Sequence, residues 1–149
     1  MINEQEEIEN KIIDWVALGT SGRLIAFKPE KGADLVIQKK GDYSGKKLFL
    51  NINVFVIPRA ENDFIMDVSQ NNFENQENAY LMFVIFDKIK RKIDEKIWLV
   101  PYLEFLRISN NFKFEPSKFL NYLTNKNKFN LFLIEKLISE NKTTKKKRG

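Results

Sequence analysis

The sequence predicts an α/β domain in which a mixed central β-sheet is flanked by helices. Two stretches are apolar at almost every position, LFLNINVFVI at Leu48–Ile57 and YLMFVIF at Tyr80–Phe86. A strand that is apolar on both faces is typical of the centre of a covered sheet. Residues 3–18 instead have apolar side chains at helical spacing, which indicates that helices supply part of the cover.

Composition narrows the classes of function. The 149 residues are 43% hydrophobic and 30% charged, which predicts one packed domain over residues 1–141. Cysteine and histidine are absent, so disulfides, thiolate zinc sites and cysteine or histidine catalysts are excluded. No apolar run approaches the roughly 20 residues of a membrane span. We therefore expect a cytoplasmic protein with no membrane contact.

The net charge of +5 is located in the last residues. Residues 142–149 are predicted to form a disordered basic tail, and the other 20 basic side chains balance the 20 acidic ones. A basic tail favours non-specific contact with nucleic acid. The candidate nucleic-acid-binding residues of the tail are Lys145, Lys146, Lys147 and Arg148.

The first half of the chain predicts a helix and then a hairpin. In residues 3–18, Ile8, Ile12 and Val16 share one side and the acidic residues take the other, with Asn3 as the amino-terminal cap. Strands are predicted at residues 23–28, 33–38 and 48–57. The last two are joined by the polar turn 39–47, so they form an antiparallel hairpin.

The second half predicts smaller elements around the strand at residues 80–86. These are a short strand near Met66, a charged turn at 87–95, a strand at 97–100, a short helix opened by Pro101, and an edge strand with Phe112 and Phe114. One or two helical turns at 117–123 and a closing helix at 129–140 follow.

Two asparagines interrupt the long strand. Alternation places Asn51 and Asn53 on one face, and the hairpin brings that face beside Asp34 of the preceding strand. Because a buried amide is costly without hydrogen-bond partners, the pair requires a reason. A hydrogen-bonded polar pocket and an active site, working or vestigial, are both possible reasons.

These stretches resemble the PD-(D/E)XK nuclease-like superfamily, which includes restriction endonucleases and Holliday junction resolvases. The matching segments are GADLV at residues 32–36 and LNINV at residues 50–54, within a resemblance that covers roughly residues 3–106. It implies a restriction-endonuclease-like core with an added C-terminal helix. It also implies a Mg²⁺ site, with Asp34 as metal ligand, Asn51 and Asn53 at the second-ligand and lysine positions, and Glu9 or Gln5 as the helix residue.

The motif differs from the family where the chemistry would lie. An amide binds Mg²⁺ weakly and neither accepts a proton near neutral pH nor supplies positive charge. Lys47 shares the strand parity of Asn51, yet about 13 Å of backbone separates them, a long reach for a relocated catalytic lysine. The sequence therefore favours an inactive member that acts as a nucleic-acid-associated binding or accessory protein, without a cofactor.

Two alternatives remain open. One is a Mg²⁺-dependent DNA or RNA nuclease with a displaced site. The other is a scaffold subunit whose acidic loop, Glu61–Glu77, meets a protein partner. Outside the tail, the turn after residue 38 is a second candidate for nucleic-acid contact, because it places an aromatic ring among cations. Its candidate binding residues are Lys39, Lys40, Tyr43, Lys46 and Lys47.

Overall fold

The computed structural model describes residues 3–41, 49–57, 65–68 and 78–139. The first segments form one helix and three strands, α1 (Glu4–Gly19), β1 (Leu24–Phe27), β2 (Leu35–Lys39) and β3 (Phe49–Ile57). The middle of the chain supplies β4 (Met66–Asp67), β5 (Ala79–Asp87), β6 (Lys92–Pro101) and α2 (Tyr102–Ile108). The last segments are β7 (Lys113–Phe114), the 3₁₀ helix η2 (Pro116–Tyr122), β8 (Leu123–Thr124), α3 (Lys126–Ile134) and the π-helical turn η3 (Glu135–Ser139).

Helix α1 begins as the sequence predicts. The Asn3 side chain accepts the Glu6 backbone N–H at 2.8 Å, and acidic residues occupy the first turn, where they favour the positive end of the helix dipole. Ile8, Ile12 and Val16 are fully buried. The prediction that every acid faces away from the core is wrong for Glu9, which is only 7% exposed.

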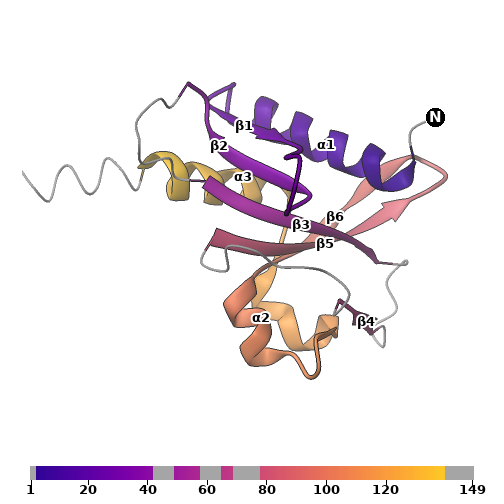
Figure 1. The fold of residues 1–149 in the computed structure, drawn as a ribbon. Helices are drawn as coiled ribbons and strands as arrows, with labels where there is room; N and C mark the ends of the chain where they lie inside the picture. Colours follow the sequence, from indigo (N-terminus) through magenta and orange to yellow (C-terminus); the bar gives the residue numbers. More distant parts are fainter. Residues whose placement is uncertain (1–2, 42–48, 58–64, 69–77, 140–149) are drawn as a thin grey trace, which may run out of the picture.

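A six-stranded mixed sheet forms the centre of the molecule, as predicted. Its order is β1-β2-β3-β5-β6-β8, and Figure 1 shows β3 and β5 crossing the middle. Strands β3 and β5 are parallel, whereas the other neighbouring pairs are antiparallel. The hairpin of β2 and β3 is confirmed, with Leu35 opposite Ile52 and Ile37 opposite Leu50.

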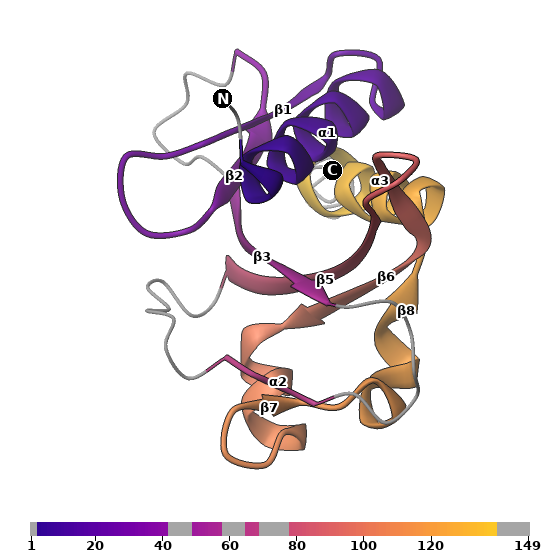
Figure 2. The same ribbon diagram turned by 90° about the vertical axis from the view of Figure 1, so that its right-hand side faces the viewer.

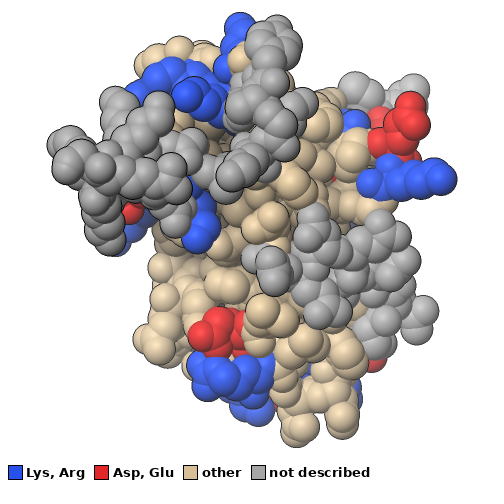
Figure 3. All heavy atoms as spheres, turned by 60° about the vertical axis from the view of Figure 1, so that its left-hand side comes forward, with Lys and Arg blue, Asp and Glu red and all other residues tan. Residues whose placement is uncertain are grey.

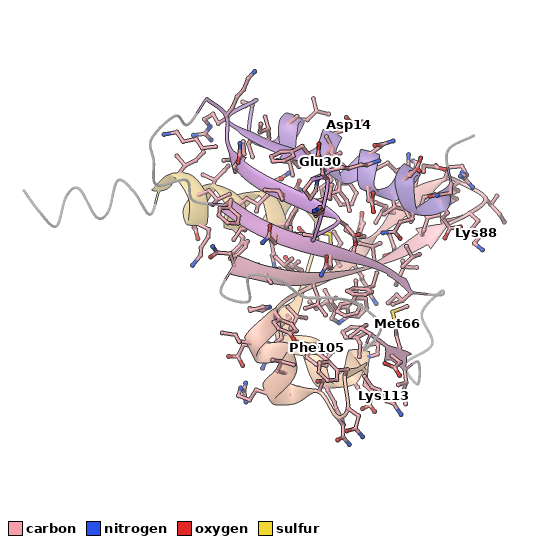
Figure 4. The ribbon with its side chains drawn as sticks, in the orientation of Figure 1. Asp14, Glu30, Met66, Lys88, Phe105 and Lys113 are labelled. Atoms are coloured by element: carbon pink, nitrogen blue, oxygen red, sulfur yellow. The ribbon has the colours of Figure 1, made fainter. Side chains whose placement is uncertain are left out.

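The sheet separates two hydrophobic cores. Figure 2 shows α1 and α3 on one side of the sheet and α2 on the other. The first core joins α1 and α3 to alternate residues of β1, β2 and β3, among them Leu24, Leu35 and Ile52. The second core lies on the α2 side and is rich in aromatic rings. In Figure 4, Phe105 and Met66 lie on that side.

Stacked phenylalanines hold the second core together. The rings of Phe83 and Phe114 are 3.7 Å apart between centroids and nearly parallel, and Phe105 stacks on Phe119 at 5.4 Å. Buried aromatic pairs of this kind add about 0.5–1.5 kcal/mol beyond the area they bury. Phe114 reaches this core from β7, which pairs with β4 in a separate two-stranded sheet.

Four predicted features differ from the structure. Strand β6 begins at Lys92 inside the predicted charged turn, because its exposed first residues continue the hairpin with β5. The closing helix begins at Lys126, where Asn125 accepts the Lys128 N–H, and η3 follows it from Glu135. Of the predicted edge strand with Phe112 and Phe114, only Lys113–Phe114 forms a strand, and this strand, β7, belongs to the small sheet.

The fourth difference concerns β3. It is fully buried on the face of Leu50, Ile52 and Val54, but Asn51 and Asn53 on the other face are only half-buried, not enclosed as expected. The sheet around them is therefore more open than the apolar sequence implied. No helix in the described part of the chain is long and apolar enough to cross a membrane.

Candidate functional site

Asp34 lies at the point where β2 begins, and it contacts β3 in two ways. Its backbone N–H donates to Asn53 Oδ1 at 3.2 Å, and its Oδ2 accepts the backbone N–H of Val54 at 2.8 Å. The backbone ladder of β2 and β3 ends at the pair of Leu35 and Ile52. Past that pair, the side chains of Asp34 and Asn53 take over the hydrogen bonding, as buried backbone groups require.

Helix α1 completes this arrangement from the other direction. Gln5 Nε2 donates to the carbonyl oxygen of Val54 at 3.2 Å and to Glu9 Oε2 at 2.9 Å. Gln5 and Glu9 are four residues apart and therefore adjacent on the helix surface. Both polar backbone groups of Val54 are thus satisfied by side chains, one from Asp34 and one from Gln5.

Lys28 adds a positive charge to the same place. It directly follows β1, and its Nζ lies 3.8 Å from Glu9 Oε1. We call Gln5, Glu9, Lys28, Asp34 and Asn53 the Glu9–Asp34 cluster. The five residues come from α1, from the connection between β1 and β2, and from β3, so the cluster forms where three chain segments meet.

Burial dominates the electrostatics of the two acids. Burial raises the pKa of Glu9, and the nearby Asp34 carboxylate raises it further, whereas the hydrogen bond from Gln5 and the charge of Lys28 act against these effects. Burial also raises the pKa of Asp34, opposed by the hydrogen bond from the Val54 N–H. Both carboxylates are therefore less acidic than free side chains, as expected for charge removed from water.

The asparagines do not both join the cluster. Asn53 contacts Asp34, as strand parity predicts. Asn51 lies opposite Val36, two positions further along the strand pair, on a half-buried face. Asn53 lies on the same face, but it is next to Val54, whose backbone groups bond both Asp34 and Gln5. The structure thus groups Asp34 with Asn53, Glu9 and Lys28 and places Asn51 apart from them.

The predicted basic residues lie elsewhere. Lys39 and Lys40 are exposed at the far end of β2, where the Lys40 N–H donates to the carbonyl oxygen of Arg23 at 3.0 Å. The other predicted nucleic-acid contacts lie outside the described residues: Tyr43, Lys46, Lys47, Lys145, Lys146, Lys147 and Arg148. The same holds for most of the acidic loop of the scaffold hypothesis, of which the structure describes residues 65–68.

Sequence reasoning missed Lys28 and the burial of Glu9. A signal existed for Glu9, because it lies three residues before Ile12 and seven before Val16, both fully buried. For Lys28 the signal was weaker. It required the antiparallel pairing that places Phe27 opposite Val36 and so brings the end of β1 beside the start of β2.

The cluster has limited capacity for a metal ion. Among the residues that the structure describes, no group of three or more acidic side chains is placed to hold one. One oxygen of each carboxylate already accepts a hydrogen bond, Asp34 Oδ2 from Val54 and Glu9 Oε2 from Gln5. Mg²⁺ is nonetheless commonly bound by only one or two carboxylates together with waters and phosphates. Glu9 and Asp34 are the residues that would hold it.

No family model, curated protein or solved structure matches this chain. The described residues themselves provide the geometry that bears on function. That geometry offers a mostly satisfied polar cluster and, at the far end of the same strands, a group of exposed cations.

Proposed function

We propose that this protein is a nucleic-acid-associated binding or accessory protein, built on a PD-(D/E)XK-like core that has lost its nuclease chemistry. The observation that supports the loss is the use of Asp34 and Asn53. At the positions where the resemblance implies a metal ligand and a catalytic lysine, the two side chains instead accept backbone N–H groups, Asp34 that of Val54 on β3 and Asn53 that of Asp34 itself. A carboxylate used in this way is a structural group.

The order of elements is compatible with this proposal. A first helix, three antiparallel strands and a later apolar strand follow one another as the resemblance implies. The site residues differ, since neutral amides replace the second acid and the lysine on β3. The sequence contains no cysteine. Because disulfides form in oxidising compartments, we also propose that the protein functions in the reducing environment of the cytoplasm.

The loss of catalysis is tested by a cleavage assay. Wild type and Asp34→Ala are incubated with single-stranded and duplex DNA and RNA in Mg²⁺ or Mn²⁺. We expect no cleavage above that of a mock purification by either protein. Metal-dependent cleavage by the wild type that disappears in Asp34→Ala would contradict the proposal.

Nucleic-acid association is tested by the salt dependence of binding. The segment 142–149 carries five cations and no acid, and each phosphate contact on duplex DNA contributes about 0.9 to the logarithmic salt slope. The segment therefore accounts for a slope of at most roughly −4 to −5. We expect its deletion to remove most of the duplex affinity. Full-length protein that binds no nucleic acid at low salt would refute the proposal.

A second candidate function is a metal-dependent nuclease with a displaced site. The observation that favours it is the position of Glu9. The charge of the nearby Asp34 contributes to the raised pKa of Glu9, and Lys28 Nζ lies 3.8 Å from Glu9 Oε1. Two carboxylates and a lysine are the side-chain types that the family uses, although the lysine comes here from the end of β1. The metal would neutralise charge at the scissile phosphate.

Calorimetric titration with Mg²⁺ and Mn²⁺ separates the two candidates. The displaced nuclease predicts metal binding that is lost in both Glu9→Gln and Asp34→Asn, together with cleavage that Lys28→Gln reduces. The binding protein predicts no metal-dependent heat beyond that of the matched control Glu30→Gln, which removes an exposed acid from the turn between β1 and β2.

A further inference from the structure

Strands β1 and β2, and β3 as far as Asn51, have one face that is not part of either core; further along β3, Phe55 packs against the second core. Leu24, Leu35 and Ile52 mark the opposite, fully buried face, which packs against α1 and α3. The alternate side chains are half-buried or exposed, and we call them the outer face: Ile25, Phe27, Val36, Gln38, Phe49 and Asn51. Figure 1 looks towards these strands from the side away from α3.

The register arranges the outer face in two rows across the three strands. One row is Phe27, Val36 and Asn51, and the other is Ile25, Gln38 and Phe49. Each row therefore combines one phenylalanine, one aliphatic side chain and one amide. With strands about 4.8 Å apart and about 3.3 Å per residue, the two phenylalanines are separated by two strands and two residues, or about 12 Å.

The aromatic rings of this face remain accessible. Phe27 is 38% exposed and Phe49 is half-buried. A scattered exposed apolar residue needs no explanation, but two rings on one face together with Ile25 and Val36 form an apolar surface that water covers at a cost. The amides of Gln38 and Asn51 add donors and acceptors between the rings.

Charge at one end of the face indicates the sign of its ligand. Strands β1, β2 and β3 contain no acidic residue. Arg23 and Lys40 are exposed at one end of the face, where the Lys40 N–H donates to the carbonyl oxygen of Arg23. Lys39, at the same end, pairs with Leu24 and alternates to the opposite face. Figure 3 shows a largely uncharged described surface with Lys and Arg gathered along its upper left.

The opposite end of the face does not share this excess. The connection from β1 to β2 carries Lys28, Glu30, Lys31 and Asp34, whose charges balance. An anionic ligand is therefore attracted to the end of the face where Arg23 and Lys40 lie. An apolar, aromatic surface with cations at one side is complementary to a single strand of nucleic acid, which has both phosphates and unstacked bases.

We propose that the outer face binds single-stranded nucleic acid, with bases stacked on Phe27 and Phe49 and phosphates at Arg23 and Lys40. The inference rests on the proposed association with nucleic acid and adds the class of ligand and its site. A duplex is disfavoured, because its bases are stacked on one another and offer no free ring face.

The stacking contacts are tested with labelled single-stranded DNA, single-stranded RNA and duplexes of equal length, by fluorescence anisotropy of full-length protein at raised salt. Stacking of one base on a protein ring contributes about 1–3 kcal/mol, so Phe27→Leu and Phe49→Leu are each expected to weaken single-strand binding about 5- to 150-fold. Leucine keeps the apolar volume and removes the ring. The matched control is Phe112→Leu, since Phe112 is 39% exposed and lies outside the face.

A second variant gives a direct signal. Phe27→Trp retains a ring, so it is expected to keep the affinity, and stacking of a base should quench the added indole fluorescence. Trp98, in contrast, is 5% exposed and should contribute little to the change. The wild type provides the baseline for both native tryptophans.

The phosphate contacts are tested by charge removal. Neutralising Arg23 and Lys40 to Gln should lower the single-strand salt slope by about 1.4, at about 0.7 for each contact. The control neutralises the exposed Lys90 and Lys92 of the β5–β6 hairpin and should leave the slope almost unchanged.

Several outcomes would overturn the inference. Full-length protein that binds duplex and single strand equally, with affinities unchanged by Phe27→Leu and Phe49→Leu, would refute the face and leave the proposed function standing on the 142–149 segment. A protein that binds no nucleic acid would refute both. Sedimentation showing that Phe27→Leu disrupts a dimer would assign the face to a second copy of the chain.

Discussion

The Asp34 carboxylate is expected to stabilise the fold as a hydrogen-bond acceptor rather than as a charge. The Val54 backbone N–H donates to Asp34 Oδ2 at 2.8 Å, just beyond the last backbone pair of β2 and β3, and Asp34→Ala removes this acceptor. Val54 is 4% exposed, so water replaces that partner poorly. An unsatisfied buried donor costs about 1–3 kcal/mol, and at this chain length each kcal/mol lowers Tm by about 2–4 °C.

Asp34→Asn separates the acceptor from the charge. The asparagine oxygen still accepts the Val54 N–H, and the variant should lie within about 1 kcal/mol of wild type near neutral pH. Because burial raises the pKa of Asp34 in the folded state, the folded protein binds the proton more tightly than the unfolded chain does. Stability therefore falls as pH rises through the interval between the ordinary and the raised pKa, and Asp34→Asn should lack that part of the decline.

Urea denaturation followed by tryptophan fluorescence measures both variants across pH. The m-value should stay constant while the midpoint changes. Glu30→Ala serves as control, because Glu30 is an exposed acid of the same turn and its loss should change the unfolding free energy by less than about 0.5 kcal/mol. The reasoning is refuted if Asp34→Asn destabilises the protein as strongly as Asp34→Ala, since the charge itself would then be required.

Three further predictions concern other contacts. Gln5→Ala removes a donor shared by two acceptors and should cost about 1–3 kcal/mol in the same denaturation assay; an unchanged midpoint would show that water takes its place. A methyl group at Gly19 would overlap the buried Asn130 amide, so Gly19→Ala should cost about 1–3 kcal/mol, and less in an Asn130→Ala background; equal costs in both backgrounds would exclude this clash. Phe114→Ala should cost about 3–5 kcal/mol by calorimetry, far more than Leu120→Ala at a side chain 63% exposed, and a similar loss at both sites would contradict the assigned core.

The fold was predictable where burial follows from local pattern. The strands at 49–57 and 79–87 are long and apolar, so hydrophobic pattern alone located them within about two residues. The predicted start of β6 was wrong, because Ile93 is the one apolar residue between Lys92 and Lys96 and the other four are exposed, so no alternating pattern marks a strand. The early start of α3 was marked by Asn125, a capping signal that the apolar residues from Phe129 onward outweighed.

The candidate site was predictable only in part. Strand parity and the hairpin sufficed to bring Asp34 to Asn53, because both depend on local geometry and a single turn. Glu9 and Lys28 depend instead on how α1 packs across the sheet, which is a tertiary contact that no short-range pattern reveals. Apolar sequence also overstated the burial of β3, since Phe49 and Asn51 lie on a half-buried face.

The parallel pairing of β3 with β5 has a consequence for how the chain folds. Strands β1, β2 and β3 follow one another within residues 24–57, and β5 and β6 form a short hairpin. In contrast, Ile52 of β3 pairs with Tyr80 of β5 only after the long stretch of chain between them has closed into a loop. Closing such a loop costs entropy before its contacts repay it, so the two antiparallel units should form first and dock last. Substitutions at the seam, such as Val54→Ala, should mainly speed unfolding if docking follows the transition state and slow folding if docking is the transition state itself. Stopped-flow kinetics of that one variant would establish when the two halves of the sheet become one.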